Sequence, residues 1–157
     1  MTDRILLQAG NEAPAFALPG LDGETVTLES FRGRGLILYF YPKDNTAGCT
    51  LEAQGFRDHL ADFESLGYAV AGVSRDSVKS HCGFRDRQQL NFELLSDKDE
   101  VACTAYGVMK EKMMYGKLCR GIERSTFVIS PEGTILHAFY GVKAKTHVDE
   151  LLALLRS

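Results

Sequence analysis

The sequence predicts one α/β domain with a central mixed β-sheet flanked by helices on both faces. Three observations support this fold class. Two continuous apolar runs, at 35–41 and 68–74, have the length and the β-favouring composition of buried strands. Each run precedes a segment with helix signals, which is the order of strand-helix-strand units. The last third of the chain has the pattern of a hairpin followed by a final helix.

The first half of the chain contributes loops, a strand and a helix. The segment to about residue 30 is rich in Gly, Pro and Asp, so we expect loops and short edge strands there, including an alternating stretch at 25–28. The buried strand at 35–41 is followed by a polar, turn-rich segment at 42–48. Apolar residues then recur at spacings of three and four, which predicts one amphipathic helix that Gly67 ends. These residues are Ala53, Phe56, Leu60 and Phe63.

The second half repeats this order and then changes to a hairpin. After the strand at 68–74, Asp76 or Ser77 can cap a helix that runs to about Gln89. The remaining expected elements are a short apolar piece at 92–95, a short helix at 99–106, hairpin strands at 125–129 and 134–140, and a last helix that includes 148–155.

Composition limits the class of protein. The chain has 157 residues, of which 45% are hydrophobic and 25% charged, so we expect one globular domain spanning 1–157. A net charge of −3 gives no basic excess for nucleic acid. The longest apolar run is far too short to cross a bilayer, and no secretory signal pattern is visible. We therefore expect a cytoplasmic protein that binds no membrane and whose four cysteines are mostly thiols.

Cys49 occupies a position that favours reactivity. It follows a buried strand and begins a helix, and sites in such sheets lie beyond the carboxyl ends of the strands. Free N–H groups and the positive end of a helix dipole stabilise a thiolate. Thr46 lies one turn earlier with a hydroxyl, and Pro42 starts the turn without an N–H. From position alone, a small buried cysteine remains an equal alternative.

A family resemblance favours the reactive interpretation. Pro42, Thr46 and Cys49 match the P-x-x-x-T-x-x-C motif of peroxiredoxins, and the run Y-P-K-D-N-T-A-G-C-T-L-E-A resembles the PrxQ group, also called bacterioferritin comigratory proteins. Further similar segments lie at 72–74, 95–97 and 121–127. The resemblance implies a thioredoxin-like fold of the peroxiredoxin type. It also implies reduction of hydrogen peroxide and organic hydroperoxides by thioredoxin or a similar dithiol, no metal or organic cofactor, and a monomer.

The resemblance also assigns roles to single residues. It implies that Cys49 is the peroxidatic cysteine, that Thr46 holds the thiolate and the peroxide, and that Pro42 shields the pocket. Arg124 matches the arginine that completes the site from a neighbouring strand. Glu52 matches the family's C-T-x-E and would fix Arg124 by a bidentate pair, although a favourable anion in a first helical turn explains it equally well.

The sequence departs from the family at the position of the second cysteine. Many PrxQ members have a cysteine five residues after the first, where this chain has Gln54. In another subgroup the resolving cysteine aligns with Arg85, and Cys82 lies about one helical turn earlier on the same side. Gly83 weakens the helix at that point. We therefore expect Cys82 to resolve the sulfenic acid through an intramolecular disulfide.

The other candidates have weaker signals. Cys103 has the surroundings of a small buried residue, and Cys119 those of an exposed bystander in a hairpin-like region. The four histidines show no metal-ligand spacing, so we expect them at the surface and predict no metal. Two alternatives to the two-cysteine enzyme remain: a one-cysteine peroxidase with an external thiol, and a non-enzymatic redox sensor or holdase. A disulfide oxidoreductase would need C-x-x-C, which is absent.

Overall fold

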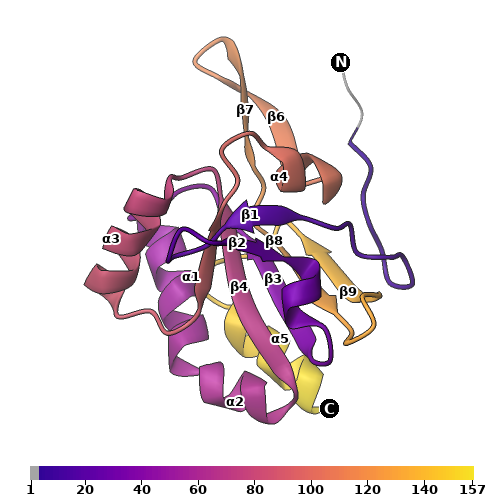
Figure 1. Ribbon diagram of the computed structural model, residues 1–157. Helices are drawn as coiled ribbons and strands as arrows, with labels where there is room; N and C mark the ends of the chain where they lie inside the picture. The colour runs from indigo at the N-terminus through magenta and orange to yellow at the C-terminus, as the bar shows by residue number, and fades with distance from the viewer. Residues whose placement is uncertain (1–3) are drawn as a thin grey trace.

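The computed structural model describes residues 4–157 and is built on a five-stranded mixed sheet with the order β5-β4-β3-β8-β9 (Figure 1). Strand β3 lies in the centre of the sheet and runs parallel to β4, which runs parallel to the edge strand β5. Strands β8 and β9 run antiparallel to their neighbours. Their bounds are Gly35–Phe40, Tyr68–Ser74, Glu93–Ser96, Ser125–Ile129 and Ile135–Tyr140. The predicted mixed sheet and the order of its strands along the chain are confirmed.

Two apolar layers cover the two faces of this sheet. One contains α1 (Ala47–Asp58), α2 (Leu60–Ser65), α3 (Val78–Gln88) and α5 (His147–Arg156). The other contains β1 (Ala17–Pro19), β2 (Thr25–Thr27), the short helix η1 (Leu28–Phe31) and α4 (Val101–Ala105). Helices do lie on both faces, as expected, but four of the five α-helices share one face.

Strand β3 shows why the sequence signal of the sheet is strong. Leu36, Leu38 and Phe40 belong to one apolar cluster, while Ile37 and Tyr39 belong to the other. All six residues of β3 are buried. Because both faces of the strand are covered, the sequence is continuously apolar instead of alternating.

The helix expected through Phe63 is in fact two helices. The chain breaks at His59, whose φ of −107° and ψ of 11° lie outside helical geometry. The break turns α2 so that Phe63 also reaches the core, where its ring packs 5.8 Å from that of Phe56. Apolar spacing continues across the break, so the pattern could not reveal it. Helix α3 begins as expected, with Ser77 as the capping residue that accepts the N–H of Ser80.

A separate hairpin projects from the body of the molecule (Figure 1). It consists of β6 (Met109–Met114) and β7 (Lys117–Ile122), which pair only with each other. Its residues are predominantly polar and exposed, so the sequence indicates this hairpin only weakly. Among the described residues, no helix has the length and apolar character needed to cross a bilayer.

Candidate active site

The thiol of Cys49 lies at the start of α1, directly beyond the carboxyl end of β3. It is the third residue of the helix, and only 1% of its surface is exposed. Arg124 immediately precedes β8, which pairs with β3 so that Ser125 lies opposite Phe40. This register brings the arginine to the end of β3, where its Nη2 donates to the Cys49 sulfur at 3.5 Å. The predicted approach of Arg124 from a neighbouring strand is present in the structure.

Glu52 holds the other side of the guanidinium. Its Oε1 accepts a hydrogen bond of 2.7 Å from Nη1 of Arg124, and the glutamate is completely buried. Glu52 Oε2 has no hydrogen-bond partner, so the pair is made through one oxygen, and the expected bidentate geometry is wrong. The reason is that Arg124 uses Nη2 for the sulfur of Cys49. One guanidinium thus bridges a carboxyl group and the thiol.

The charges of this pair are coupled. Burial raises the pKa of Glu52 to about 7, against the opposing attraction of Arg124. Burial alone would lower the pKa of Arg124, but the nearby Glu52 and Cys49 outweigh it and raise this pKa. Arg124 therefore stays charged beside the sulfur, where a cation favours a thiolate over a thiol.

Gly48 leaves the space that the arginine occupies. A Cβ built on this glycine would lie 3.0 Å from Arg124 Nη2 and 3.6 Å from Cβ of Ala144. Any larger residue would press on the group that contacts Cys49. No residue pattern predicts this role of Gly48, although the glycine stands directly before Cys49.

Thr46 and Pro42 lie on the loop that leads from β3 into α1, and both are exposed. Thr46 is the residue before the first turn of α1, but its side chain caps no N–H group. Its hydroxyl donates instead to the carbonyl of Lys43 at 2.8 Å. The single hydroxyl proton of Thr46 is therefore engaged within the loop, and donation to a peroxide requires rotation of this side chain.

All four cysteines are free thiols. Cys82 lies on α3, half-buried, and donates to the carbonyl of Leu21 at 3.2 Å. Cys103 is buried in α4, where burial and then the neighbouring Asp97 raise its pKa far above the usual range, as befits an unreactive core thiol. Cys119 lies half-buried on β7. Cys49 and Cys82 are thus separate thiols on different helices.

Two histidines expected at the surface are buried, and that expectation is wrong for them. His81 is completely buried and lies 2.7 Å from a carboxylate oxygen of Asp44. His147 is 4% exposed, and its Nε2 lies 2.8 Å from the hydroxyl of Thr126. Burial lowers the pKa of His147 to about 4. The spacing of His81 three residues before the apolar Phe84 was a signal for a shared buried face.

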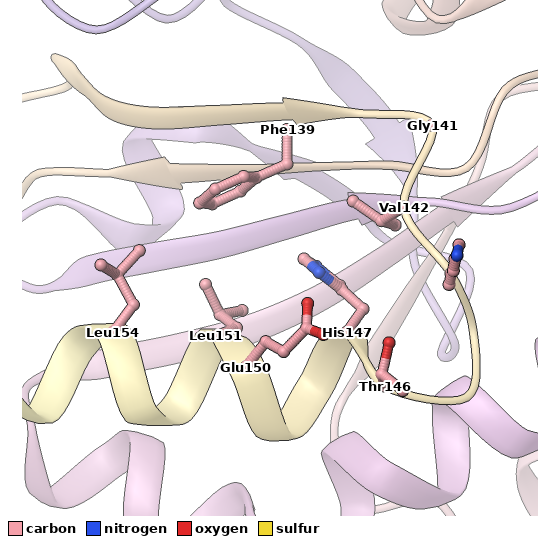
Figure 2. A pocket seen from close by; sticks show the side chains of 9 residues that line it. Phe139, Gly141, Val142, Thr146, His147, Glu150, Leu151 and Leu154 are labelled. Carbon is pink, nitrogen blue, oxygen red and sulfur yellow. The ribbon is translucent and has the colours of Figure 1, made fainter.

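A cavity lies between β9, the loop that follows it, and α5. It has a volume of about 330 Å³. Figure 2 shows His147, Glu150 and Leu151 projecting from α5 toward Phe139 and Val142. Cys49 is not among the lining residues, so the cavity is distinct from the thiol, although its loop also contacts Arg124 through the Val142 N–H.

Comparison with known proteins places this geometry in a family. Residues 9–138 match the model of the AhpC/TSA family. The peroxiredoxin Bcp of Xanthomonas campestris pv. campestris is 49% identical and aligned over 100% of this chain and 98% of its own length. The peroxiredoxin Bcp of Escherichia coli K12 is 42% identical, with 96% of each chain aligned.

Solved structures give the same relationship. Peroxiredoxin Q of Xanthomonas campestris superposes with a TM-score of 0.87 at 46% identity, covering 99% of this chain and 98% of the other. A cysteine variant of Xylella fastidiosa PrxQ gives a TM-score of 0.86 at 40% identity, covering 99% and 97%. The match confirms the thioredoxin-like fold of the peroxiredoxin type. The chain belongs to the AhpC/TSA family, in which it is a peroxiredoxin of the PrxQ or Bcp group and hence a thiol peroxidase.

Proposed function

We propose that Cys49 reduces hydrogen peroxide and organic hydroperoxides and is then regenerated through Cys82 and an external dithiol. Peroxide reduction by Cys49 is supported by one observation. The buried Cys49 sulfur lies 3.5 Å from Nη2 of Arg124, and Glu52 accepts a hydrogen bond from Nη1 of the same arginine. A solved relative from Xanthomonas campestris is described in terms of alkyl peroxide reduction activity, which supports the same substrate class for this chain.

The first step is a nucleophilic displacement at oxygen. The Cys49 thiolate attacks one peroxide oxygen, an S–O bond forms, and the O–O bond breaks. The departing oxygen takes a proton and leaves as water or an alcohol. Cys49 is oxidised by two electrons to a sulfenic acid while the peroxide is reduced.

Arg124 stabilises both the thiolate before attack and the charge that develops during attack. Its charge lowers the free energy of the thiolate before attack, and its N–H groups face the negative charge that develops on the breaking O–O bond. Thr46 supplies a hydroxyl to the peroxide after rotating away from Lys43, and Pro42 limits access of water to the loop. These two roles are supported by the position of both residues directly before α1.

The second step regenerates the thiol. The thiol of Cys82 attacks the sulfenic sulfur of Cys49, a disulfide forms, and water leaves; thioredoxin or a similar dithiol then reduces the disulfide by exchange. A disulfide requires Cα atoms within about 7 Å. The Cys82 thiol is engaged with the carbonyl of Leu21, and it lies on a different helix from Cys49, so bond formation calls for local unwinding at Cys82 and Gly83.

A turnover assay tests the proposal. Wild-type protein should consume many equivalents of peroxide with thioredoxin and thioredoxin reductase, and Cys49→Ser should consume none. A sensor or holdase would consume a single equivalent. Cys103→Ser serves as the matched control, because Cys103 is a buried thiol outside the site and its loss should leave turnover intact.

The assignment of Cys82 needs its own variant. Cys82→Ser should react once with peroxide, accumulate sulfenic or over-oxidised Cys49, and stall with thioredoxin. Normal thioredoxin-dependent turnover of Cys82→Ser would instead establish a one-cysteine cycle or another resolving thiol.

A further inference from the structure

A buried ion pair joins the loop before Cys49 to the helix that carries Cys82. Asp44 lies in the loop between β3 and α1 and is 4% exposed, while His81 on α3 is completely buried. Their side chains meet at 2.7 Å between Nδ1 of His81 and Oδ2 of Asp44. The pair therefore contacts α3 one residue before Cys82 and the active-site loop five residues before Cys49.

Further hydrogen bonds hold both side chains of this pair in place. Nε2 of His81 faces the carbonyl of Leu95 at 3.0 Å, so it must carry a hydrogen, and Nδ1 faces Asp44. Asp44 also accepts hydrogen bonds from the hydroxyls of Tyr41 and Ser80, at 2.6 and 2.8 Å. Burial raises the pKa of Asp44, but these hydrogen bonds and the charge of His81 outweigh it and hold the pKa below its usual range. Both ring nitrogens of His81 therefore face oxygen atoms, one of them a carboxylate oxygen of Asp44.

A second carboxylate fixes the same loop to the sheet. The backbone N–H of Asp44 donates to Oδ2 of Asp76 at 2.9 Å, and the hydroxyl of Ser74 donates to the same oxygen at 2.6 Å. The hydroxyl of Ser96 donates to the backbone carbonyl of Asp76 at 2.6 Å. The ends of β4 and β5, the loop and the first turn of α3 are thus one hydrogen-bonded unit.

Asp44 and His81 each precede the cysteine of their own segment. Asp44 precedes Cys49, and His81 precedes Cys82 and Gly83. Unwinding of α3 from Cys82 onward would leave the bonds of His81 intact. The segment of α3 that must unwind for a disulfide therefore begins at Cys82, directly after His81, which the hydrogen bonds hold in place.

We propose that the Asp44–His81 pair positions Cys82 for attack on Cys49, by holding the first turn of α3 against the active-site loop while the helix unwinds from Cys82. This inference rests on the proposed resolving role of Cys82. Asp44 and His81 are positioning residues, since they touch neither the sulfur of Cys49 nor that of Cys82 in the described contacts.

The benefit of the pair is a shorter connection between the two thiols. Along the chain, Cys82 lies 33 positions after Cys49. Through the pair, Cys49 lies five positions from Asp44, and Cys82 lies one position from His81. The entropic cost of bringing two points together grows with the logarithm of the connecting length, so this shortening corresponds to about tenfold in rate at most. The strands that remain folded supply part of the same restraint, so about three- to tenfold is expected.

Rapid quenching separates the two chemical steps. His81→Gln and Asp44→Asn should oxidise Cys49 within about twofold of the wild-type rate, but should form the Cys49–Cys82 disulfide about three- to tenfold more slowly. Over-oxidation of Cys49 at high peroxide should rise in parallel. His59→Gln is the matched control, because His59 also pairs with carboxylates, those of Asp62 and Asp149, yet belongs to a different part of the fold.

Hydrogen exchange on unsubstituted protein gives a second test that does not require folded variants. Oxidation should speed amide exchange at 82–88 and leave Ser80 and His81, whose N–H groups donate to Ser77, protected. Wild-type protein that forms no Cys49–Cys82 disulfide would overturn both the proposed resolution and this inference. Disulfide formation at wild-type rates in both variants, or loss of protection at Ser80 and His81, would overturn the inference alone.

Discussion

At the scale of single residues, the guanidinium of Arg124 divides its two terminal nitrogens between a carboxyl group and a sulfur. Nη1 lies 2.7 Å from Glu52 and Nη2 lies 3.5 Å from Cys49. The planar fork of arginine holds both contacts at once, which the single ammonium group of lysine cannot do. The proposed role of Arg124 thus depends on the shape of this side chain as well as on its charge.

Arg124→Ala should slow oxidation of Cys49 by about 10²–10³-fold, the usual cost of losing one preorganised electrostatic donor. Arg124→Lys should recover only part of this loss. The chain contains no tryptophan whose fluorescence could report the oxidation, so competition for peroxide with a haem peroxidase is a suitable measurement of the rate. Oxidation of Arg124→Ala at the wild-type rate, in protein whose thermal midpoint shows it to be folded, would exclude the assigned role.

Glu52 and His147 give opposite dependences of stability on pH. The pKa of Glu52 is about 7 in the folded protein, above its ordinary value, so its contribution to stability is full below about pH 4.5 and is lost as pH rises to 7. The pKa of His147 is about 4, below its ordinary value, so stability is lost as pH falls from about 6.5 to 4.

Single substitutions should therefore reveal slopes that largely cancel in the wild type. Glu52→Gln should make the free energy of unfolding rise with pH between 4.5 and 6.5, and His147→Gln should make it fall. Each slope should amount to at most about 3 kcal/mol over the interval. Urea unfolding at several pH values measures both, and parallel profiles for the wild type and the two variants would contradict these assignments.

At the scale of elements, the first turn of α1 is shaped by a glycine. Gly48→Ala would place a methyl group 3.0 Å from Arg124 Nη2, closer than most Cβ contacts. The helix itself should tolerate alanine, which has the higher helix propensity. We therefore expect slower oxidation of Cys49 with an unchanged or raised thermal midpoint. Competition kinetics and thermal unfolding on the same sample test this, and an unaltered oxidation rate would show that Arg124 adjusts freely.

The elements differ in how well the sequence predicts them. Strands β3 and β4 are buried on both faces, so their own residues specify them without reference to any partner. The break at His59 leaves no trace in the apolar spacing, because Phe56 and Phe63 are buried on both sides of it. The β6–β7 hairpin is largely exposed and stabilised by backbone pairing, which polar sequences allow without signalling it.

The candidate site also contains features that the local sequence predicts and features that it does not. Cys49, Thr46 and Pro42 lie within one short run, so local sequence places them together. The monodentate contact of Glu52 depends on how Arg124 shares its nitrogens, which no local pattern contains. The partnership of Asp44 with His81 joins residues 37 positions apart, and it follows from the parallel pairing of β3 and β4 that brings the loop and α3 to one edge.

At the scale of the whole molecule, the sheet brings chemistry from three separate segments to one end. The start of α1 supplies Cys49, the chain before β8 supplies Arg124, and α3 supplies Cys82, the proposed resolving thiol. Strand β3 pairs with β4 on one side and with β8 on the other, so Cys49, which follows β3, lies between the segments that supply Cys82 and Arg124. Among the four thiols, Cys49 is the one that contacts a cation at hydrogen-bond distance in the described residues.

The most direct test of this account is peptide mapping of Cys82→Ser protein after one equivalent of hydrogen peroxide, with a sulfenic-acid trapping reagent present. Substitution of Cys82 removes the proposed resolving thiol, so the first oxidation product should persist long enough to be trapped. We expect the trapped adduct on Cys49, with Cys103 and Cys119 recovered as thiols. An adduct on Cys103 or Cys119 with Cys49 still reduced would contradict it.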